Sequence, residues 1–387
     1  MNIRNMYKSF YTRFFSRRSL LFITIVGFCL RMVFFAWPSG DYIEYLHPWF
    51  EQIKQNGGID AIGEPIGNYM VSYIYILALL TYLPLPDIVS IKIVSCIGDI
   101  ILAFYCMKLS FAVSRDSIIS KMVYVAVICS PSVILNSGAW AQCDSLYTAA
   151  LIAFLYYIAV NDSKKAMISV SVAFCLKLQT VFLAPIILAA FLKGKIKWRH
   201  VFYAPLIYLL MIFPAYIQGR SLKSLILLYF DQAKTYTALS MNAPNFYAWF
   251  PWQYTNEKLE ILGIVVAFMI TLILPIFIVI NNLSLDGTDL VKFALYSATL
   301  LPFVLPHMHE RYFYLASVLS LIYIIGCSNK ANTYYIINIC SFLLTIRFVF
   351  GALWVSAAVL SIPMAIVCFF LTIEVYNCKK RSMDSLG

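Results

Sequence analysis

The sequence predicts an all-α membrane protein with many transmembrane helices. Of its 387 residues, 62% are hydrophobic and only 12% are charged, and the mean hydropathy is +0.81. Apolar runs of this number and length exceed what the core of a globular domain can bury. The runs are continuous and do not alternate with period two, which excludes a membrane barrel. We therefore expect one transmembrane domain over residues 1–387, without a soluble domain or an internal repeat.

Basic residues predict the orientation of the bundle. The net charge of +11 could indicate nucleic-acid binding, but the basic residues cluster in short loops, as they do on the cytoplasmic face of membrane proteins. No small-residue cleavage pattern follows the first apolar run, so we expect a retained span and no cleaved signal. The basic loops are 1–18, 108–121, 161–165, 193–199 and the tail Lys379-Lys380-Arg381. If all of them are cytoplasmic, both termini are cytoplasmic and each intervening segment crosses the membrane an even number of times.

The first element is a span over 19–37, and the second span is 88–108. A third apolar run, 69–86, lies between them and would make the number of crossings odd. This run is rich in tyrosine and ends in Leu83-Pro84-Leu85-Pro86. We therefore expect it to form a helix that lies at the external surface.

The next ambiguous element is 166–192, which is long for one span and short for two. Lys177 stands near its centre, so we expect two short helices that meet there and that enter and leave on the cytoplasmic side. The other expected spans are 119–135, 145–160, 201–217, 259–281, 291–305, 312–326, 333–352 and 356–377. The total is about twelve transmembrane helices, and the external segments are 38–87, 136–144, 218–258 and 306–311.

Asp41 follows the first span almost at once. A carboxylate fixed at a membrane surface can take a proton from a hydroxyl nucleophile, and partial burial suits it to that task. A solvated loop acid is the alternative interpretation. His47 and Trp49, in the same segment, are candidate substrate contacts.

The external loop 136–145 combines Trp140, Gln142 and Asp144. Amide and acid groups bond sugar hydroxyls, and an aromatic face stacks on a pyranose ring. Helix capping is the alternative for Asp144, but capping gives no reason for the tryptophan and the glutamine.

Lys177 and Gln179 stand at membrane depth, far from either basic loop. A cation where two half-helices meet is well placed to bind an anion, and a snorkelling lysine is the alternative. The segment 218–258, which includes Asn245 and Trp249, is aromatic and amphipathic. It fits a substrate lid or surface helix, or else an interfacial aromatic belt.

Residues 307–311, His-Met-His-Glu-Arg, place four ionisable groups in five positions between two apolar runs. Such a cluster at the end of a span indicates a functional site. His307, His309 and Arg311 can grip a phosphate, Arg347 adds a further cation, and Glu310 can orient a neighbour. Paired histidines also bind zinc, but no third ligand lies nearby in the sequence, so no metal or other cofactor is indicated.

The order of these motifs resembles the GT-C superfamily of polyprenyl-phosphate-sugar-dependent glycosyltransferases. The residues that carry the resemblance are Asp41 after the first span, the loop Trp-Ala-Gln-Cys-Asp at 140–144, Lys177 with Gln179, and Met-His-Glu-Arg-Tyr at 308–312. The chain looks most similar to bacterial relatives of the second mannosyltransferase of GPI-anchor synthesis, and it is also similar to the dolichyl-phosphate-glucose glucosyltransferases. The resemblance covers most of the chain and is weakest after residue 350.

The resemblance implies an inverting transfer in which Asp41 is the base and Glu44 is a candidate second acid. It assigns the donor phosphate to Lys177, His307, His309 and Arg311, to which we add Arg347. The candidate substrate contacts are His47, Trp49, Trp140, Gln142, Asp144, Gln179, Asn245, Trp249 and Glu310. The implied setting is a bacterial inner membrane, with an undecaprenyl-phosphate hexose as donor and an envelope glycan or lipid-linked acceptor on the external face.

Two alternatives remain at this point. A lipid-linked glycan polymerase or ligase would use a polyprenyl diphosphate donor and would be expected to carry more external arginines than Arg220 and Arg311. A transporter would place polar groups at the bilayer midplane and show inverted repeats. Here the polar groups apart from Lys177 collect at one face, which favours an enzyme.

Overall fold

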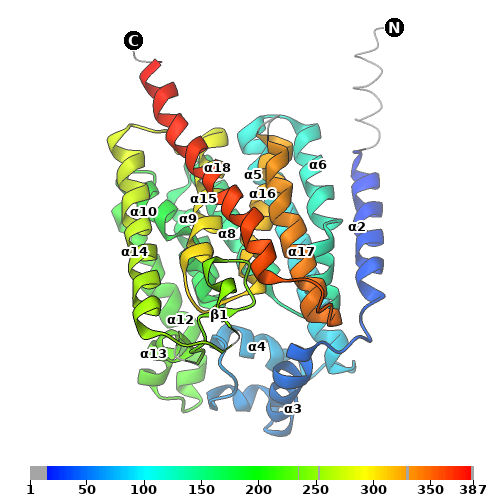
Figure 1. Ribbon diagram of the computed structural model, residues 1–387. Coiled ribbons are helices and arrows are strands. Elements are labelled where there is room, and N and C mark those ends of the chain that lie inside the picture. The colour runs from blue at the N-terminus through cyan, green and yellow to red at the C-terminus, as the bar shows by residue number, and fades with distance from the viewer. Residues whose placement is uncertain (1–14, 234, 252, 328–330, 385–387) are drawn as a thin grey trace.

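The computed structural model describes residues 15–233, 235–251, 253–327 and 331–384, and it shows a bundle of helices (Figure 1). The basic residues Arg4, Lys8 and Arg13 lie outside this described part. In the first half of the chain the helices are α2 (Arg17–Met32), α3 (His47–Gln55), α4 (Val71–Leu80), α5 (Asp87–Ser114), α6 (Ser117–Ile128), α7 (Pro131–Ile134), α8 (Asp144–Ala159), α9 (Ser163–Leu176) and α10 (Ala184–Leu192). The remaining helices are α11 (Trp198–Val201), α12 (Tyr203–Ile217), α13 (Leu222–Ala233), α14 (Glu257–Ile280), α15 (Gly287–Val304), α16 (Tyr314–Gly326), α17 (Tyr335–Phe350) and α18 (Ala357–Asp384).

Short turns and one small sheet join these helices. The turns are η1 (Tyr42–Leu46), η2 (Gly58–Gly63), η3 (Leu135–Ala139), η4 (Leu178–Leu183), η5 (Phe246–Trp249), η6 (Glu310–Phe313) and η7 (Ala331–Tyr334). Strands β1 (Ser240–Met241) and β2 (Met308–His309) pair in parallel, with Ser240 opposite Met308 and Met241 opposite His309. This pairing fastens the segment after α13 to the short segment before α16.

Four helices among the described residues are long and apolar enough to cross a membrane, at 87–114, 198–217, 257–280 and 357–379. Residues 117–128 and 131–139 form a fifth candidate, bent by 45°. The expected number of about twelve spans is therefore not confirmed. Several other helices begin and end within a few residues of the expected spans but are short. The 16 residues of α8 reach about 24 Å, less than the ~30 Å of a bilayer core.

The break expected near Lys177 is confirmed. Helix α9 ends there, and Lys177 has an extended backbone (φ −151°, ψ 143°) before η4 and α10 continue. The carbonyl groups that the break leaves unpaired find other donors, because the Ser72 hydroxyl donates to the Cys175 carbonyl and the Tyr229 hydroxyl donates to the Phe174 carbonyl. The short helices are thus held by side chains from two distant segments.

Residues 69–86 form a shorter helix than expected, and other segments of the chain cover much of its surface. Helix α4 packs against α3 and η2 through Phe50, Ile53 and Ile62, and its own Ile74 and Leu77 are fully buried. The apolar side chains that made this stretch resemble a span are thus satisfied by a small core of their own.

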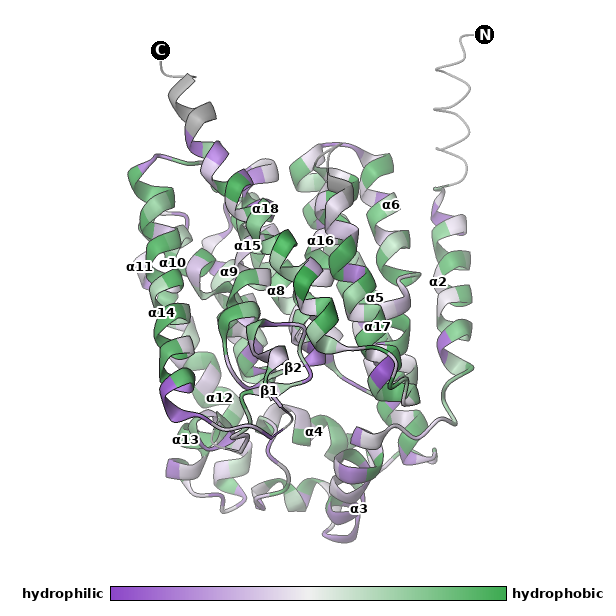
Figure 2. Cartoon of the chain, in the orientation of Figure 1, coloured by the Kyte–Doolittle hydropathy of each residue, from purple (hydrophilic) through white to green (hydrophobic). Residues whose placement is uncertain are grey.

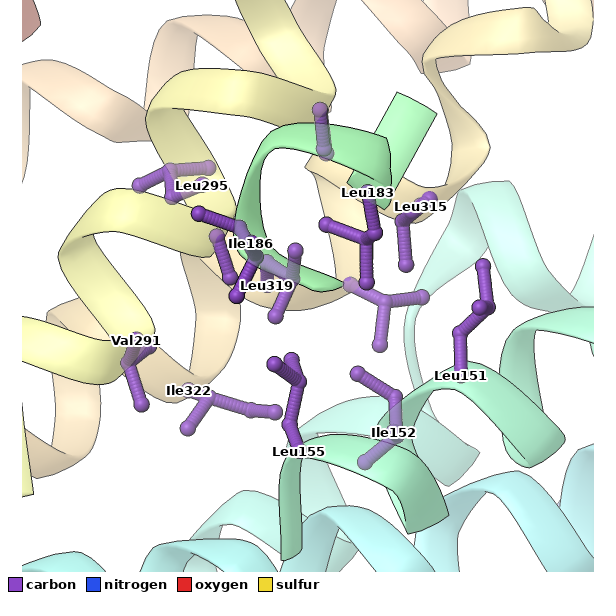
Figure 3. Packing of buried hydrophobic residues seen from close by; sticks show 14 of the residues in the cluster. Leu151, Ile152, Leu155, Leu183, Ile186, Val291, Leu295, Leu315, Leu319 and Ile322 are labelled. Atoms are coloured by element: carbon purple, nitrogen blue, oxygen red, sulfur yellow. The ribbon is translucent and has the colours of Figure 1, made fainter. Parts of the chain in front are cut away.

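The main core lies between α8, α10, α15 and α16. Figure 3 shows leucine and isoleucine side chains from these helices and η4 interlocking, among them Leu155, Ile186, Leu295 and Leu319. Figure 2 shows hydrophobic residues along the middle of the bundle and hydrophilic residues on α3 and in the loops. Helices α3, α4 and α13 and strand β1 gather at one end, while α2 begins and α18 ends at the opposite end (Figure 1).

Candidate active site

A cavity of about 190 Å³ with several charged and amide side chains in its wall lies where the segments that end in β1 and β2 meet η1 and the loop after η3. Segments far apart in the sequence supply its walls. The lining residues are Gly40, Asp41, Glu44, Tyr45, Leu46, Trp49, Asn68, Tyr69, Gln142, Tyr236, Met241, Asn242, His309, Glu310, Arg311 and Phe348. We call it the central cavity.

Asp41 is held in this cavity by three donors on one oxygen. Its Oδ2 accepts hydrogen bonds from Trp140 Nε1 (3.0 Å), Gln142 Nε2 (2.6 Å) and Arg311 (2.5 Å). These donors fit the ionised form, because an ionised carboxylate only accepts hydrogen bonds. No described residue bonds Oδ1, so this second oxygen can accept a proton from a bound hydroxyl group.

The loop after η3 places the tryptophan and the glutamine. Trp140 is fully buried and stacks on Phe348, with ring centroids 4.5 Å apart, and the Ser39 hydroxyl donates to the Trp140 carbonyl. Ala141 has a φ of +64°, a conformation that is uncommon for a residue with a Cβ. This turn directs the Trp140 and Gln142 side chains to the same carboxylate.

Lys177 is paired in the structure. Its Nζ lies 2.6 Å from Asp144 Oδ1, and both side chains are buried. Asn136 Nδ2 bonds the other Asp144 oxygen at 2.9 Å, and Lys177 Nζ lies 3.5 Å from Gln142 Oε1. Gln142 thus links this ion pair to Asp41.

A buried ion pair supports η3. Arg31 Nε lies 2.7 Å from Asp99 Oδ2, and the Ser137 hydroxyl donates to the same oxygen at 2.6 Å. Arg31 also donates to the carbonyl groups of Gly27 and Ile128, which joins α2 to the end of α6. The turn that carries Trp140 and Gln142 is thereby fixed to two helices.

The side chains of the motif at 307–311 lie in different surroundings and make different contacts. His307, with φ +61°, forms a 2.7 Å bond to the Ala238 carbonyl and lies 3.3 Å from Glu260. Burial lowers the pKa of His309 to about 3, so this side chain is neutral at physiological pH. Burial raises the pKa of Glu310 to about 7. Arg311 is the charged member that reaches Asp41.

Two buried nitrogen atoms beside Asp41 have no partner among the described residues, Arg311 Nε and His309 Nε2. A buried polar atom without a partner is costly, so each one needs an explanation, and a bound ligand is one such explanation. The Arg311 guanidinium also lies 5.7 Å from the Trp140 ring. An anion bound here would satisfy donors that the protein alone leaves open.

Other predicted site residues do not bond Asp41. His47 is half exposed and pairs with Asp87 at 2.6 Å. Asn245 is buried and caps η5, and its amide donates to the carbonyl groups of Pro302 and Leu305. Trp249 is exposed and donates to Ser361. Glu44 and Trp49 line the central cavity, but neither bonds Asp41.

Three further cavities lie near the central cavity. A neck of about 20 Å³ shares Asn68, Tyr69, Tyr236 and Arg311 with it and adds Lys177 and Gln179. Beyond the neck lies a mostly apolar cavity of about 320 Å³, which includes Gln179, His307 and Met308 in its wall. A side cavity of about 200 Å³ shares Asn242, Glu310 and Phe348 with the central cavity and includes Arg347.

Sequence reasoning missed several residues of this site. Tyr69 donates to Gln142 at 3.3 Å, and its ring lies 5.1 Å from Lys177 Nζ. Tyr236 and Asn242 line the cavity. The chain has 27 tyrosines, so one more in a loop gave no signal. In contrast, an arginine and an aspartate inside apolar runs, as at Arg31 and Asp99, are an identifiable sign of a buried pair.

Within the described ranges, no three His, Cys, Asp or Glu side chains are grouped so that they could hold a metal ion. No protein-family model matches the chain, and no curated protein matches it significantly.

Proposed function

We propose that this protein is an integral-membrane inverting glycosyltransferase of the GT-C type. It transfers one sugar from a polyprenyl-phosphate donor, in a bacterium an undecaprenyl-phosphate hexose, to a hydroxyl group of an envelope glycan or lipid-linked acceptor. The observation that carries the proposal is Asp41, a carboxylate with one free oxygen, beside unpartnered buried donors and a passage to an apolar cavity.

In the proposed reaction, Asp41 Oδ1 takes the proton of the acceptor hydroxyl group as its oxygen attacks the anomeric carbon of the donor. A bond forms between that oxygen and the anomeric carbon, and the bond from the anomeric carbon to the phosphate oxygen breaks. The phosphate leaves with the electron pair, and the single displacement inverts the anomeric configuration. The Trp140 and Gln142 donors hold the base in position.

Negative charge grows on the leaving phosphate, so donors aimed at it favour the transition state over the bound substrate. Arg311 Nε is available for this role because no described residue uses it, and His309 Nε2 is available in the tautomer that carries its proton on this nitrogen. The neck holds only about 20 Å³, so a phosphate enters it only if Arg311 and its neighbours move. We propose that the guanidinium shifts from Asp41 toward the phosphate when the donor binds.

The apolar cavity supports a donor with a hydrocarbon chain. Its walls are mostly leucine, isoleucine, valine, phenylalanine and tyrosine side chains, which favour contact with an isoprenoid over contact with water. It shares Gln179, Gln232, Tyr236 and Tyr312 with the neck. The phosphate of a lipid bound in this cavity would therefore lie in the neck, next to Lys177 and Arg311.

The finer membrane arrangement belongs to the same proposal. We propose about twelve transmembrane helices, in which short helices such as α8, α9 and α10 count as partial spans. Both termini are cytoplasmic and the cavity faces the periplasm, in the inner membrane. The start of α2 and the end of α18 at one end of the bundle, opposite α3 and α4, support this orientation (Figure 1).

The test is a transfer assay with purified protein in detergent, a panel of radiolabelled undecaprenyl-phosphate hexoses and a cell lipid extract as acceptor. Wild type and the control Asp60→Asn, which changes an exposed acid of η2, should label the extract, whereas Asp41→Asn should not. If wild type consumes no monophosphate donor, the proposal fails. Consumption of a diphosphate-linked glycan would then favour a polymerase or ligase, and consumption of neither would favour transport.

A further inference from the structure

The side cavity borders the central cavity through shared wall residues and shares none with the neck. Its walls are Asn242, Glu310, Leu344, Arg347, Phe348 and Leu353. Three of these also line the central cavity, but none lines the neck or the apolar cavity. Leu353 is 81% exposed, so it lies at the rim of the side cavity. A molecule can therefore reach Asp41 from this side without displacing whatever occupies the neck.

Glu310 is the buried polar group that the side cavity and the central cavity share. Its side chain is 4% exposed, and no other side chain in the described part of the chain bonds its carboxyl group. Burial raises the pKa of this carboxyl group to about 7, so near neutral pH it can both donate and accept a hydrogen bond. Such a group is suited to a ligand hydroxyl, which also donates and accepts.

The remaining walls are typical of a carbohydrate site. Arg347 donates one bond to the Val355 carbonyl and forms no ion pair with a described residue, so the rest of its guanidinium can bond a ligand. Asn242 adds an amide. One face of Phe348 stacks on Trp140, and its ring also lines both cavities. An aromatic ring with a few polar groups around it is the usual setting for a bound sugar.

We propose that the side cavity is the subsite for the acceptor, and that it binds the hydroxyl-bearing sugar unit that receives the transferred residue. This inference rests on the proposed function, since it assigns the second substrate of the same site. It also gives Arg347 a different task from the donor-phosphate role that the sequence predicts for it.

The arrangement of the cavities supports this assignment. A single displacement needs the attacking oxygen and the leaving oxygen on opposite sides of the anomeric carbon. The side cavity and the neck both adjoin the central cavity but share no lining residue. A donor held in the neck and an acceptor held in the side cavity would meet beside Asp41, with the acceptor hydroxyl within reach of the base.

The first test separates the two substrates kinetically, with the undecaprenyl-phosphate hexose that wild type uses and the same cell lipid extract as acceptor. Glu310→Gln and Arg347→Gln should raise the apparent KM for the extract about tenfold, the cost of one good hydrogen bond, and leave the donor KM within about twofold. Gln179→Ala, in the wall of the neck, should do the reverse. Slow donor hydrolysis by water should persist in both side-cavity variants.

An increase in donor KM with an unchanged acceptor KM in Glu310→Gln and Arg347→Gln would overturn the subsite but leave the glycosyltransferase in place. A wild type that neither transfers nor hydrolyses the donor would instead refute the proposed function, and the subsite with it. The hydrolysis rate distinguishes the two failures.

The second test does not depend on turnover and changes a surface residue only. Leu353→Cys places a thiol at the rim, and the neighbouring Trp354→Cys, 76% exposed and outside the cavity wall, is the matched control. The lipid extract should slow maleimide labelling of Leu353→Cys and not of Trp354→Cys, and undecaprenyl phosphate alone should slow neither. Protection of Leu353→Cys by undecaprenyl phosphate, or no protection by an extract that wild type glycosylates, would contradict the proposal.

Discussion

The ion pair between Lys177 and Asp144 provides a prediction that separates folding from catalysis. The side chains are 7% and 3% exposed, and the two charged atoms lie 2.6 Å apart. Replacing Lys177 with methionine, which has a similar length, leaves the Asp144 charge buried without its partner. Loss of one partner of a buried pair costs about 3–5 kcal/mol. Lys177→Met alone should therefore destabilise the protein severely, and so should Asp144→Asn alone.

The double variant Lys177→Met with Asp144→Asn should regain most of the lost stability. It leaves no buried charge, and Asn136 can still donate to the asparagine carbonyl that replaces the bonded oxygen. Neutral replacement of a complete buried pair is often neutral or stabilising. Stability is measured as the temperature at which half of the protein leaves the monodisperse peak in size-exclusion chromatography after heating in detergent.

A second ion pair supplies the control. Lys195 lies 2.5 Å from Asp286, and the lysine side chain is 18% exposed but the aspartate side chain is 51% exposed, so solvent screens this pair more than it screens Lys177 and Asp144. Exposed pairs contribute about 0–1 kcal/mol, so Lys195→Met should change the half-loss temperature little. If Lys177→Met lowered the half-loss temperature as little as Lys195→Met does, Lys177 would not be needed to neutralise the buried Asp144 charge.

Activity of the folded double variant then tests the role of Lys177 beside the donor phosphate. Removal of a preorganised donor to developing charge costs roughly 10²–10³ in kcat. A double variant that is stable but loses turnover by this factor supports a Lys177–Asp144 pair that serves both the fold and the reaction. Full turnover in that variant would reduce Lys177 to a structural residue.

Four further predictions test other parts of the proposed structure and function. Arg311→Lys keeps the charge but cannot bond Asp41 and Tyr69 together. Because one charge-assisted bond is lost, kcat in the transfer assay should fall at least about tenfold. Unchanged kinetics would count against the role of the guanidinium group. Asp99→Asn should lower stability by about 3–5 kcal/mol, because it leaves the Arg31 charge buried; a half-loss temperature equal to that of wild type would argue against this buried pair. The pKa of Glu310 is about 7 in the folded protein and 4.5 normally. Wild type should therefore lose stability relative to Glu310→Gln as pH rises from 4.5 to 7, by about 3 kcal/mol in total. A difference in half-loss temperature between wild type and Glu310→Gln that stays constant over this range would contradict the raised pKa. The charged groups near Glu310 are Asp41, Asp144, Arg311 and Arg347. A topology reporter fused after residue 86 should report an external position, and a cytoplasmic readout would overturn the proposed orientation.

The sequence predicts those features of this fold that are local. Long apolar runs mark the helices because a helix end or a loop is polar. The break at Lys177 was predictable because one lysine at the centre of an apolar run too long for one span must find a partner. The number of full spans was not predictable, since α8, α9 and α10 are mostly apolar and the structure makes each of them only 9 to 16 residues long.

Some residues of the candidate site were likewise predictable from the sequence, and others were not. Asp41, Trp140, Gln142 and Arg311 were selected from sequence because polar side chains are rare near the ends of apolar runs, and the structure brings all four together. Asn245, although equally polar, serves as a cap for η5.

Two outcomes depend on long-range contacts. The sequence did not identify Asp144 as the partner of Lys177, because the two residues lie 33 positions apart. Burial of the motif at 307–311 makes His309 neutral, and only three-dimensional packing determines that burial.

The measurement that tests the central claim most directly separates donor binding from turnover in purified Asp41→Asn. Our account predicts that this variant binds the undecaprenyl-phosphate hexose about as tightly as wild type, because the donor phosphate is held by other residues. Its transfer rate should fall by about 10²–10⁴, the usual contribution of a general base. Normal transfer by a correctly folded Asp41→Asn would contradict the account.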